Sequence, residues 1–502
     1  MGDCRAEGIQ LLAGTNMLWL CLYFRSLSLD VLARGDCSPV PRVIVFGPET
    51  RLQVLVPNAA ALVRGIHAEM RLSAAQTLVD DLHVLTRDAA AEQAAVSSIA
   101  AWCGQFTSTV SLLSPDAVLL EIGASLRLFG GLPPLRQTID AGITALGYHV
   151  QTGIAPTPLG AWWLARANIA EPATDREQLR AALARVPLRG MALKSDVMAV
   201  LQGVGLRTVG DCLRLPRDAL ARRCGATFIN MLDRALGDAP DPRPLFVLPP
   251  YFTSRLPLPA AVDDCAMLLF AIHRLVLELA GFLQAREAGV PGFVLQLYHP
   301  GQVPTTVSIG LVSASRDAAH LLRLVRTKLE QTPLPDGVHE VALVARDIRP
   351  LAATATTLFD TAETRGSDHW TALVEQLRAR LGDNAVTGLQ LVADHRPERA
   401  WHYCAPGEDG PGMSDAARPL WLLVEPLLLR QRDQRPLLPG HHGALTLQRG
   451  PERIESGWWD GGDVMRDYFA ARHDDGIRVW LFRERCPDAT GQRRWFLHGI
   501  FG

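Results

Sequence analysis

One stretch of the chain places a carboxylate at the start of an apolar strand. Two apolar runs, residues 110–113 and 117–122, flank the turn Ser114-Pro115-Asp116, and this pattern predicts a β-hairpin. The second run is apolar on both faces, which is typical of an interior strand in a covered sheet. Asp116 is then either an ordinary turn residue, since Asp is favoured in turns, or one ligand of a metal site.

The hairpin also resembles a known motif. Its residues Ser114-Pro115-Asp116-Ala117-Val118-Leu119-Leu120-Glu121 are similar to the palm signature Ser-x-Asp-Glu-x-x-x-Asp of Y-family translesion DNA polymerases. Residues 18–27 resemble the first palm strand of that family, which normally reads Asp-x-Asp-x-Phe. The resemblance implies acids that hold two Mg²⁺ ions, which clamp the attacking and leaving oxygens of a phosphoryl transfer.

Most of these acids have other residues in their places. Tyr23 and Arg25 stand where the first strand should offer two carboxylates, and Ala117 stands where the hairpin should offer Glu. Only Asp116 remains, because Glu121 lies five residues further on and therefore on the opposite face of the strand. Arg25 would also repel a dication. The pattern resembles the ImuB family, the non-catalytic Y-family homologues of bacterial mutasome cassettes, over nearly the whole chain. We therefore expect a polymerase scaffold that is not an enzyme and holds no metal or other cofactor.

An active polymerase with a rearranged metal site is the alternative. In that interpretation Asp30 or Asp36 joins Asp116. Asp30 lies five residues beyond Arg25, on the helix expected next, so the backbone would have to reorganise. A plain DNA-binding repair module without partners would leave the tryptophan-rich tail unexplained.

The resemblance also implies a grip on the incoming nucleotide. Residues 59–70 resemble the helix and turn that bind its triphosphate, but Ala59 and Leu62 stand in place of a Tyr and an Arg, and Arg64 is near enough to leave that alignment open. Residues 153–161 resemble Gly-Ile-Ser-x-Asn-Lys-x-x-Ala, with Pro158 in place of the Lys. The metal ligands and the nucleotide ligands are therefore missing together.

Residues 201–208 match a helix–hairpin–helix turn that would bind DNA through Gly203, Val204, Gly205 and Arg207. Such a turn works because paired glycines let backbone N–H groups approach a phosphate beside a helix N-terminus. Ser195 is the expected N-cap of the preceding helix. Further cations follow at Arg214, Arg217, Arg222 and Arg223. A plain helix connector is the alternative interpretation.

Residues 351–360 form a short stretch of small and polar residues that ends in Thr357, Leu358 and Phe359 before an acid. It resembles the Gln-Leu-x-Leu-Phe peptide with which polymerases bind the sliding clamp, although the Gln is missing. An extended peptide of this kind gains its affinity from a few apolar anchors in a groove. A linker with two apolar residues is an equally simple interpretation.

Composition sets the remaining limits. Among 502 residues the nine cysteines are scattered singly, so neither a zinc site nor a disulfide framework is predicted, and His441-His442 is better explained as part of a loop. The net charge of −2 does not by itself indicate nucleic acid. Residues 1–16 lack the features of a signal peptide, and no apolar run is predicted to be long enough to cross a bilayer. We expect a cytoplasmic, nucleoid-associated protein.

The predicted fold class is α+β multidomain, with three or four domains expected for this length. The resemblance implies the following parts: a disordered extension at 1–16, a palm at 17–27 and 96–172, fingers at 28–95, a thumb with the helix–hairpin–helix at 173–245, a β/α little finger at 250–350, a linker with the clamp peptide at 351–366, and a partner-binding region at 367–502. That last region should contain an amphipathic helix at 367–381, carrying Trp370, and a β-rich module, and it holds seven of the eleven tryptophans, a residue enriched at interface hot spots. The implied partners are primer–template DNA, the sliding clamp, a DnaE-type error-prone polymerase (ImuC) and the RecA-like protein ImuA, with no membrane.

Overall fold

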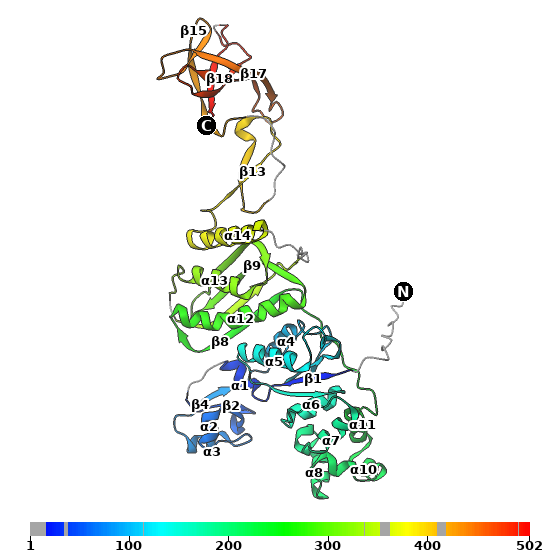
Figure 1. Ribbon diagram of the computed structural model, residues 1–502. Coiled ribbons are helices and arrows are strands. Elements are labelled where there is room, and N and C mark those ends of the chain that lie inside the picture. Colours follow the sequence, from blue (N-terminus) through cyan, green and yellow to red (C-terminus); the bar gives the residue numbers. More distant parts are fainter. Residues whose placement is uncertain are drawn as a thin grey trace, which may run out of the picture. The chain divides into compact units, whose positions relative to one another are not determined.

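The computed structural model describes most of the chain, and Figure 1 shows the course of its backbone. The described residues are 17–34, 39–113, 115–335, 337–351, 362–408, 418–489 and 491–501, with the backbone alone for 362–369. The chain divides into two compact units, Met1–Arg380 and Leu381–Gly502. The first unit mixes helices and sheets and the second is rich in strands, so the α+β multidomain class is confirmed. The extension predicted to be disordered, 1–16, lies outside the described residues.

The first sheet contains the predicted hairpin. Its strands are antiparallel and follow the order β5-β6-β1-β7. Their bounds are β1 Trp19–Tyr23, β5 Val110–Leu113, β6 Ala117–Glu121 and β7 Gln151–Ala155. Strand β6 lies between β5 and β1 and is buried over 117–120. Both the hairpin and the interior position of its second strand are therefore confirmed.

Helices cover both faces of this sheet. One face packs on α4 (Ala89–Cys103) and α5 (Leu132–Ala145), and the other packs on α6 (Pro158–Arg166). Successive residues of a strand point to opposite faces, so Leu22 joins the α4–α5 core whereas Tyr23 joins the α6 core. The backbones of β7 and α6 approach so closely that a Cβ on Gly153 would lie 2.3 Å from the carbonyl oxygen of Ala161.

A small three-stranded sheet with a core of its own precedes α4. Its order is β3-β2-β4, with β2 parallel to β4 and antiparallel to β3. The bounds are α1 Leu27–Leu32, β2 Arg42–Phe46, η1 Glu49–Arg51, β3 Gln53–Pro57, α2 Ala59–Val63, α3 Leu72–Leu78 and β4 His83–Thr86.

A helical region follows α6 and extends the core that α6 shares with the first sheet. Its bounds are α7 Arg176–Ala184, η3 Leu188–Met191, α8 Ser195–Gly203, α9 Val209–Leu213, α10 Arg217–Cys224 and α11 Ala226–Leu236. The predicted hairpin is the connection between α8 and α9. The prediction that Ser195 is the N-cap of α8 was wrong by one residue, because the extended backbone that precedes the helix is that of Lys194.

A second large sheet follows the proline-rich segment 240–250. Its order is β10-β9-β11-β8, and β12 pairs with β9. The bounds are β8 Phe252–Val262, α12 Cys265–Ala285, β9 Ala288–Tyr298, β10 Thr305–Ser315, α13 Ala318–Leu329, β11 Val338–Ala345 and β12 Arg349–Pro350. Sequence analysis missed β8, which contains Pro257 and Pro259. Both prolines are tolerated there because β8 is an edge strand of the sheet.

Helix α12 corrects one expectation about membranes. Among the described helices it is long and apolar enough, by length and composition, to cross a bilayer, contrary to the prediction from the sequence. Most of its apolar residues, among them Leu275 and Leu279, are instead buried in one core with the strands of the second sheet and with α13, although Met267 and Phe270 are exposed. Packing against protein therefore accounts for the composition of α12.

Helix α14 (Ala362–Leu381) begins five residues before the start predicted for it, and Gly382 follows it with φ +101°. Most of its apolar stripe is exposed, with Trp370 67 % exposed and Leu373 46 % exposed, whereas Val374 is buried. The helix is attached to the second sheet by Glu375, which is buried and accepts hydrogen bonds from Val312 N (2.7 Å) and His320 Nε2 (2.5 Å). The apolar stripe expected from the sequence is therefore buried only in part.

The second unit consists of strands, as predicted for the β-rich module. A two-stranded ribbon, β13 with β14, precedes a six-stranded antiparallel sheet of order β16-β15-β20-β19-β18-β17. The bounds are β13 Gly388–Leu391, η4 Pro397–Arg399, β14 Trp401–Cys404, β15 Trp421–Arg432, β16 Arg435–Leu437, β17 Leu445–Ser456, β18 Val464–His473, β19 Arg478–Glu484 and β20 Trp495–Ile500. Trp480 and Trp495 are buried in its cores, whereas four tryptophans are exposed: Trp401, Trp421, Trp458 and Trp459.

Candidate functional site

The residues predicted for the metal position meet at one end of the first sheet. Tyr23, the last residue of β1, is paired with Ala117, the first residue of β6. Phe24 N donates a hydrogen bond to Asp116 O at 2.8 Å, which joins the strand end to the hairpin turn. Arg25 follows in an exposed turn. The structure therefore brings together the four positions that sequence analysis assigned to this site.

A cation that sequence analysis missed lies at the same place. The guanidinium carbon of Arg166, the last residue of α6, is 5.0 Å from the centroid of the Tyr23 ring and 5.2 Å from that of Trp162. Arg166 Nε donates to Gly190 O at 3.0 Å, and this bond fixes the position of the charge. Nothing in the local sequence near Tyr23 indicated this contact, because β1 and α6 meet only in the folded chain.

Burial and charge set the protonation of this site. Burial raises the pKa of the Asp116 carboxyl above its usual value, and the positive charge of Arg166 opposes that shift. Burial also raises the pKa of the Tyr23 hydroxyl, so this phenol stays neutral at physiological pH. One half-buried carboxylate beside a fixed guanidinium and a neutral phenol is a poor ligand set for Mg²⁺, which requires several oxygens.

Two other carboxylates lie in this region, and each has a partner of its own. Glu92 accepts hydrogen bonds from Arg87 Nη2 at 2.7 Å and Ser28 Oγ at 2.5 Å. Burial raises the pKa of the Glu92 carboxyl, but these hydrogen bonds lower it by more, so its pKa lies below the usual value. Asp30, which the rearranged-site alternative requires, accepts from His149 N at 3.0 Å and lies 2.9 Å from His149 Nδ1. Asp36 lies outside the described residues.

The positions expected to grip a nucleotide are apolar or occupied. Ala59 and Leu62 are exposed on α2, as is Arg64 just after it. Pro158 is buried at the start of α6. The N-terminus of that helix is closed by Thr157, whose Oγ1 accepts from Gly160 N at 3.1 Å and donates to Ala235 O at 2.7 Å.

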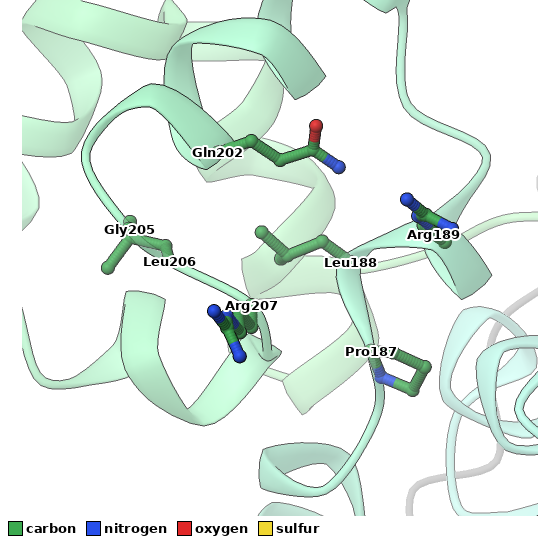
Figure 2. A pocket seen from close by; sticks show the side chains of 7 residues that line it. All are labelled: Pro187, Leu188, Arg189, Gln202, Gly205, Leu206 and Arg207. Carbon is green, nitrogen blue, oxygen red and sulfur yellow. The ribbon is translucent and has the colours of Figure 1, made fainter.

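The predicted hairpin forms one wall of a cavity of about 390 Å³. The cavity is lined by Pro187, Leu188, Arg189, Gln202, Gly205, Leu206 and Arg207. Figure 2 shows Arg189 and Arg207 on either side of Leu188, with Gln202 on the α8 side. Both arginines are exposed. The sequence indicated Arg207 and the segment that contains Gln202, but not Arg189, which a main-chain hydrogen bond from Leu188 N to Arg207 O (2.9 Å) brings to the hairpin.

The backbone of the hairpin corrects the mechanism expected from its sequence. Its N–H groups already have acceptors: Val204 N bonds Val200 O (3.3 Å), Gly205 N bonds Gln202 O (3.0 Å), Leu206 N bonds Leu201 O (3.0 Å), and Arg207 N and Thr208 N both bond Asp211 Oδ2 (3.0 Å). These donors are therefore not free for a phosphate. The side chains of Arg189 and Arg207 are the donors that face the cavity.

Only one of the two hairpin glycines has a backbone that requires glycine. Gly205 has φ +83°, in the left-handed region, whereas Gly203 is the last residue of α8. A Cβ at either position would meet no atom within 4 Å. The expected close approach is that of a DNA phosphate, so open space in front of both glycines leaves that expectation a prediction.

Comparisons with known proteins match this chain to one family over most of its length. The family model IMS (impB/mucB/samB family) matches residues 40–166. Protein ImuB of Caulobacter vibrioides, in strains NA1000 / CB15N and ATCC 19089 / CIP 103742 / CB 15, is 30% identical over 465 residues, which cover 87% of this chain and 100% of that protein. The chain belongs to the ImuB family. The resemblance noted from the palm motif is thereby confirmed.

Solved structures with likeness to this ImuB-family chain are Y-family polymerases. An insertion ternary complex of Dbh DNA polymerase is 15% identical with a TM-score of 0.38, covering 67% of this chain and 100% of its own. DinB from Sulfolobus solfataricus is 14% identical with a TM-score of 0.36 and the same coverage.

The remaining site predicted for this ImuB-family chain, the clamp peptide at Thr357, Leu358 and Phe359, lies outside the described residues.

Proposed function

We propose that this ImuB-family chain is a catalytically inactive homologue of Y-family polymerases and acts as an adaptor in error-prone translesion synthesis. The observation that carries the proposal is the end of β1 and β6. There, burial raises the pKa of the Asp116 carboxyl while the positive charge of Arg166 lowers it, and the guanidinium carbon of Arg166 lies 5.0 Å from the centroid of the Tyr23 ring. A fixed cation opposes dications, and one carboxylate cannot replace the ligands that Mg²⁺ needs.

Primer extension tests this proposal directly. We expect the purified protein to add no nucleotide to a primer with Mg²⁺ or Mn²⁺, on undamaged or lesion-containing templates, because the oxygens of the transfer would have no metal to stabilise them. The Asp116→Ala variant is the matched control for trace contamination, since a contaminating polymerase would be unaffected by it. Extension by the wild type that disappears in Asp116→Ala would favour the active polymerase with a rearranged metal site.

The hairpin cavity supports binding to DNA. Arg189 and Arg207 present two guanidinium groups at one opening, and guanidinium groups bind phosphate through paired N–H donors. No hydrogen bond or ion pair of either side chain occurs with the described residues, whereas Arg217 of the same region is bonded to Asp233 at 2.6 Å. We assign the phosphate contact to Arg189 and Arg207, in place of the backbone N–H groups of Gly203, Val204 and Gly205.

Charge reversal at the cavity should weaken binding to primer–template DNA. Arg189→Glu with Arg207→Glu should lower the affinity and reduce the slope of log affinity against log salt by about one for each phosphate that is no longer bound. Arg127→Glu with Arg180→Glu, two exposed arginines outside the cavity, makes the same change in net charge and is the matched control. Equal affinities and equal salt slopes for both charge-reversed proteins would remove the cavity from the DNA interface.

The second unit has the surface expected of a partner-binding region. Trp421 is 71 % exposed, Trp458 77 % and Trp459 61 %, which is unusual for the largest apolar side chain. Tryptophans of this kind are frequent among interface hot spots. We assign to this unit the contacts with the DnaE-type polymerase ImuC and the RecA-like ImuA, and to residues 357–359 the contact with the sliding clamp. Such an adaptor would act in the cytoplasm at the nucleoid.

A further inference from the structure

Three potential metal ligands meet at the turn between β18 and β19. His473 is the last residue of β18, Asp475 lies in the turn, and His441 lies in the loop between β16 and β17. The carboxylate of Asp475 is 2.6 Å from His441 Nδ1 and 2.7 Å from His473 Nδ1. One ligand atom from each residue lies within 4.8 Å of the other two. Sequence analysis had only His441-His442 and interpreted it as a loop.

Main-chain hydrogen bonds hold these ligands in place. His473 N donates to Ile477 O at 2.8 Å and Gly476 N donates to His473 O at 2.9 Å, which closes the turn. Ala444 N donates to Asp474 Oδ2 at 2.7 Å and thereby joins the loop of His441 to the same turn. The His473 side chain is only 1 % exposed. Ligands positioned by a rigid scaffold in this way bind with little loss of conformational freedom.

The proton positions around His473 conflict if hydrogen bonds alone hold the cluster. Asp475 N donates to His473 Nδ1 at 3.3 Å, which requires a lone pair on that nitrogen. The same nitrogen lies 2.7 Å from Asp475 Oδ1, which also presents lone pairs and would require a proton there. The buried Nε2 of His473 has no hydrogen-bond partner among the described residues, so no second contact fixes the tautomer. A cation between the imidazole and the carboxylate would satisfy both lone pairs.

The donor set indicates which cation fits. Two imidazole nitrogens and one carboxylate oxygen suit Zn²⁺, whereas Mg²⁺ prefers an all-oxygen shell. Tetrahedral Zn²⁺ with bonds of about 2.0–2.1 Å separates its ligand atoms by about 3.3 Å. The contacts of 2.6 and 2.7 Å would therefore open by about 0.6 Å. His441 and Asp475 are exposed and can withdraw by that distance, while buried His473 stays fixed.

We infer that His441, His473 and Asp475 form a zinc site with a fourth position for water. The ion would fasten the loop before β17 to the turn after β18. Leu438 belongs to the buried cluster of this sheet, and Leu445 and Ile477, which flank the site, pack against that cluster. The ion would therefore join these two segments at the edge of the six-stranded sheet while its fourth position stays open to water, as in zinc sites with three protein ligands, and the site is independent of the proposed adaptor function.

Zinc titration of the full-length chain tests this site. After treatment with EDTA and dialysis, the wild type should bind one Zn²⁺ per chain in calorimetry, and Zn²⁺ should raise its melting temperature. Loss of an outer-shell partner typically weakens metal binding about 10–100-fold, and loss of a ligand should cost at least as much. His441→Ala and Asp475→Asn, both at exposed positions, should therefore bind at least about tenfold more weakly and lose the thermal shift.

A neighbouring histidine provides the matched control. His442→Ala removes an exposed imidazole next to His441 and should bind Zn²⁺ like the wild type. Replacing zinc with Co²⁺ should give visible absorption bands of a tetrahedral ion in the wild type and in His442→Ala alone. The inference is overturned if the wild type binds no Zn²⁺, or if His441→Ala and Asp475→Asn bind it as tightly as the wild type does, which would place the ion at cysteines or other histidines.

Discussion

Replacing Glu278 of α12 with Ala should lower the free energy of unfolding of the first unit by about 3–5 kcal/mol, because it leaves a buried guanidinium without its anion. Arg34 and Glu278 form an ion pair in which both side chains are almost fully buried, at 4 % and 1 % exposure. Ser98 Oγ at 2.7 Å and Ser254 Oγ at 2.6 Å also donate to the Glu278 carboxylate. The Arg34 guanidinium lies over the Tyr148 ring at 4.3 Å.

This network joins segments that are distant along the chain. Arg34 follows α1, Ser98 belongs to α4, and Ser254 belongs to β8. Next to the network, α12 and α4 approach so closely that a Cβ on Gly281 would lie 2.1 Å from Trp102 Cδ1. Arg34 also lines a cavity of about 530 Å³ with Ser98 and Ser254, but its side chain is only 4 % exposed, so most of the cost of an unpaired buried charge should still appear.

Urea unfolding of the full-length protein measures the effect. The double variant Arg34→Met with Glu278→Leu is the matched control, because an apolar pair of similar volume removes both charges and should cost much less than Glu278→Ala alone. Glu278→Gln should fall between them, since it keeps the acceptor for the two serines but loses the charge. A loss below about 1 kcal/mol in Glu278→Ala, the range of ordinary substitutions, would contradict a buried pair at this position.

Replacing both Leu358 and Phe359 with Ala should weaken binding to the sliding clamp by about a thousandfold, since hot-spot anchors contribute roughly 2 kcal/mol each and about 1.4 kcal/mol is tenfold in affinity. The two residues are large and apolar within a stretch that is otherwise small and polar, and this pattern is typical of a peptide that binds a preformed groove. A pull-down of purified clamp, followed by calorimetry, measures the loss. Thr354→Ala in the same stretch is the matched control and should bind like the wild type.

The same experiment separates the clamp contact from the other proposed contacts. DNA binding of the double variant should be unchanged, because Arg189 and Arg207 are untouched. A chain truncated after Leu381 should keep the clamp and lose ImuC and ImuA, which are assigned to the second unit. Wild-type clamp affinity in the Leu358→Ala, Phe359→Ala protein would mean that this stretch is only a linker.

Local pattern alone determined much of the architecture. The turn at Asp116 with its two apolar runs predicted the hairpin β5–β6, and the two-sided apolarity of 117–122 predicted its interior place in the sheet. The segment 201–208 predicted the connection between two short helices. These features could be predicted because a strand, a turn and a helix boundary each depend on residues a few positions apart.

Only the tertiary structure decided which side chains and backbone groups of those elements are in contact and which are exposed. Arg166 of α6 lies against Tyr23 of β1. The N–H groups of the hairpin are bonded to internal acceptors, including Asp211. His441 and His473, which are distant in sequence, both lie next to Asp475. Most of the apolar stripe of α14 is exposed, while the adjacent residues Val374 and Glu375 are buried and Glu375 is bonded to Val312. Each of these outcomes depends on which surfaces pack together. A single sequence contains no local signal for such long-range contacts, because they depend on how side chains from distant segments fit together in the folded core.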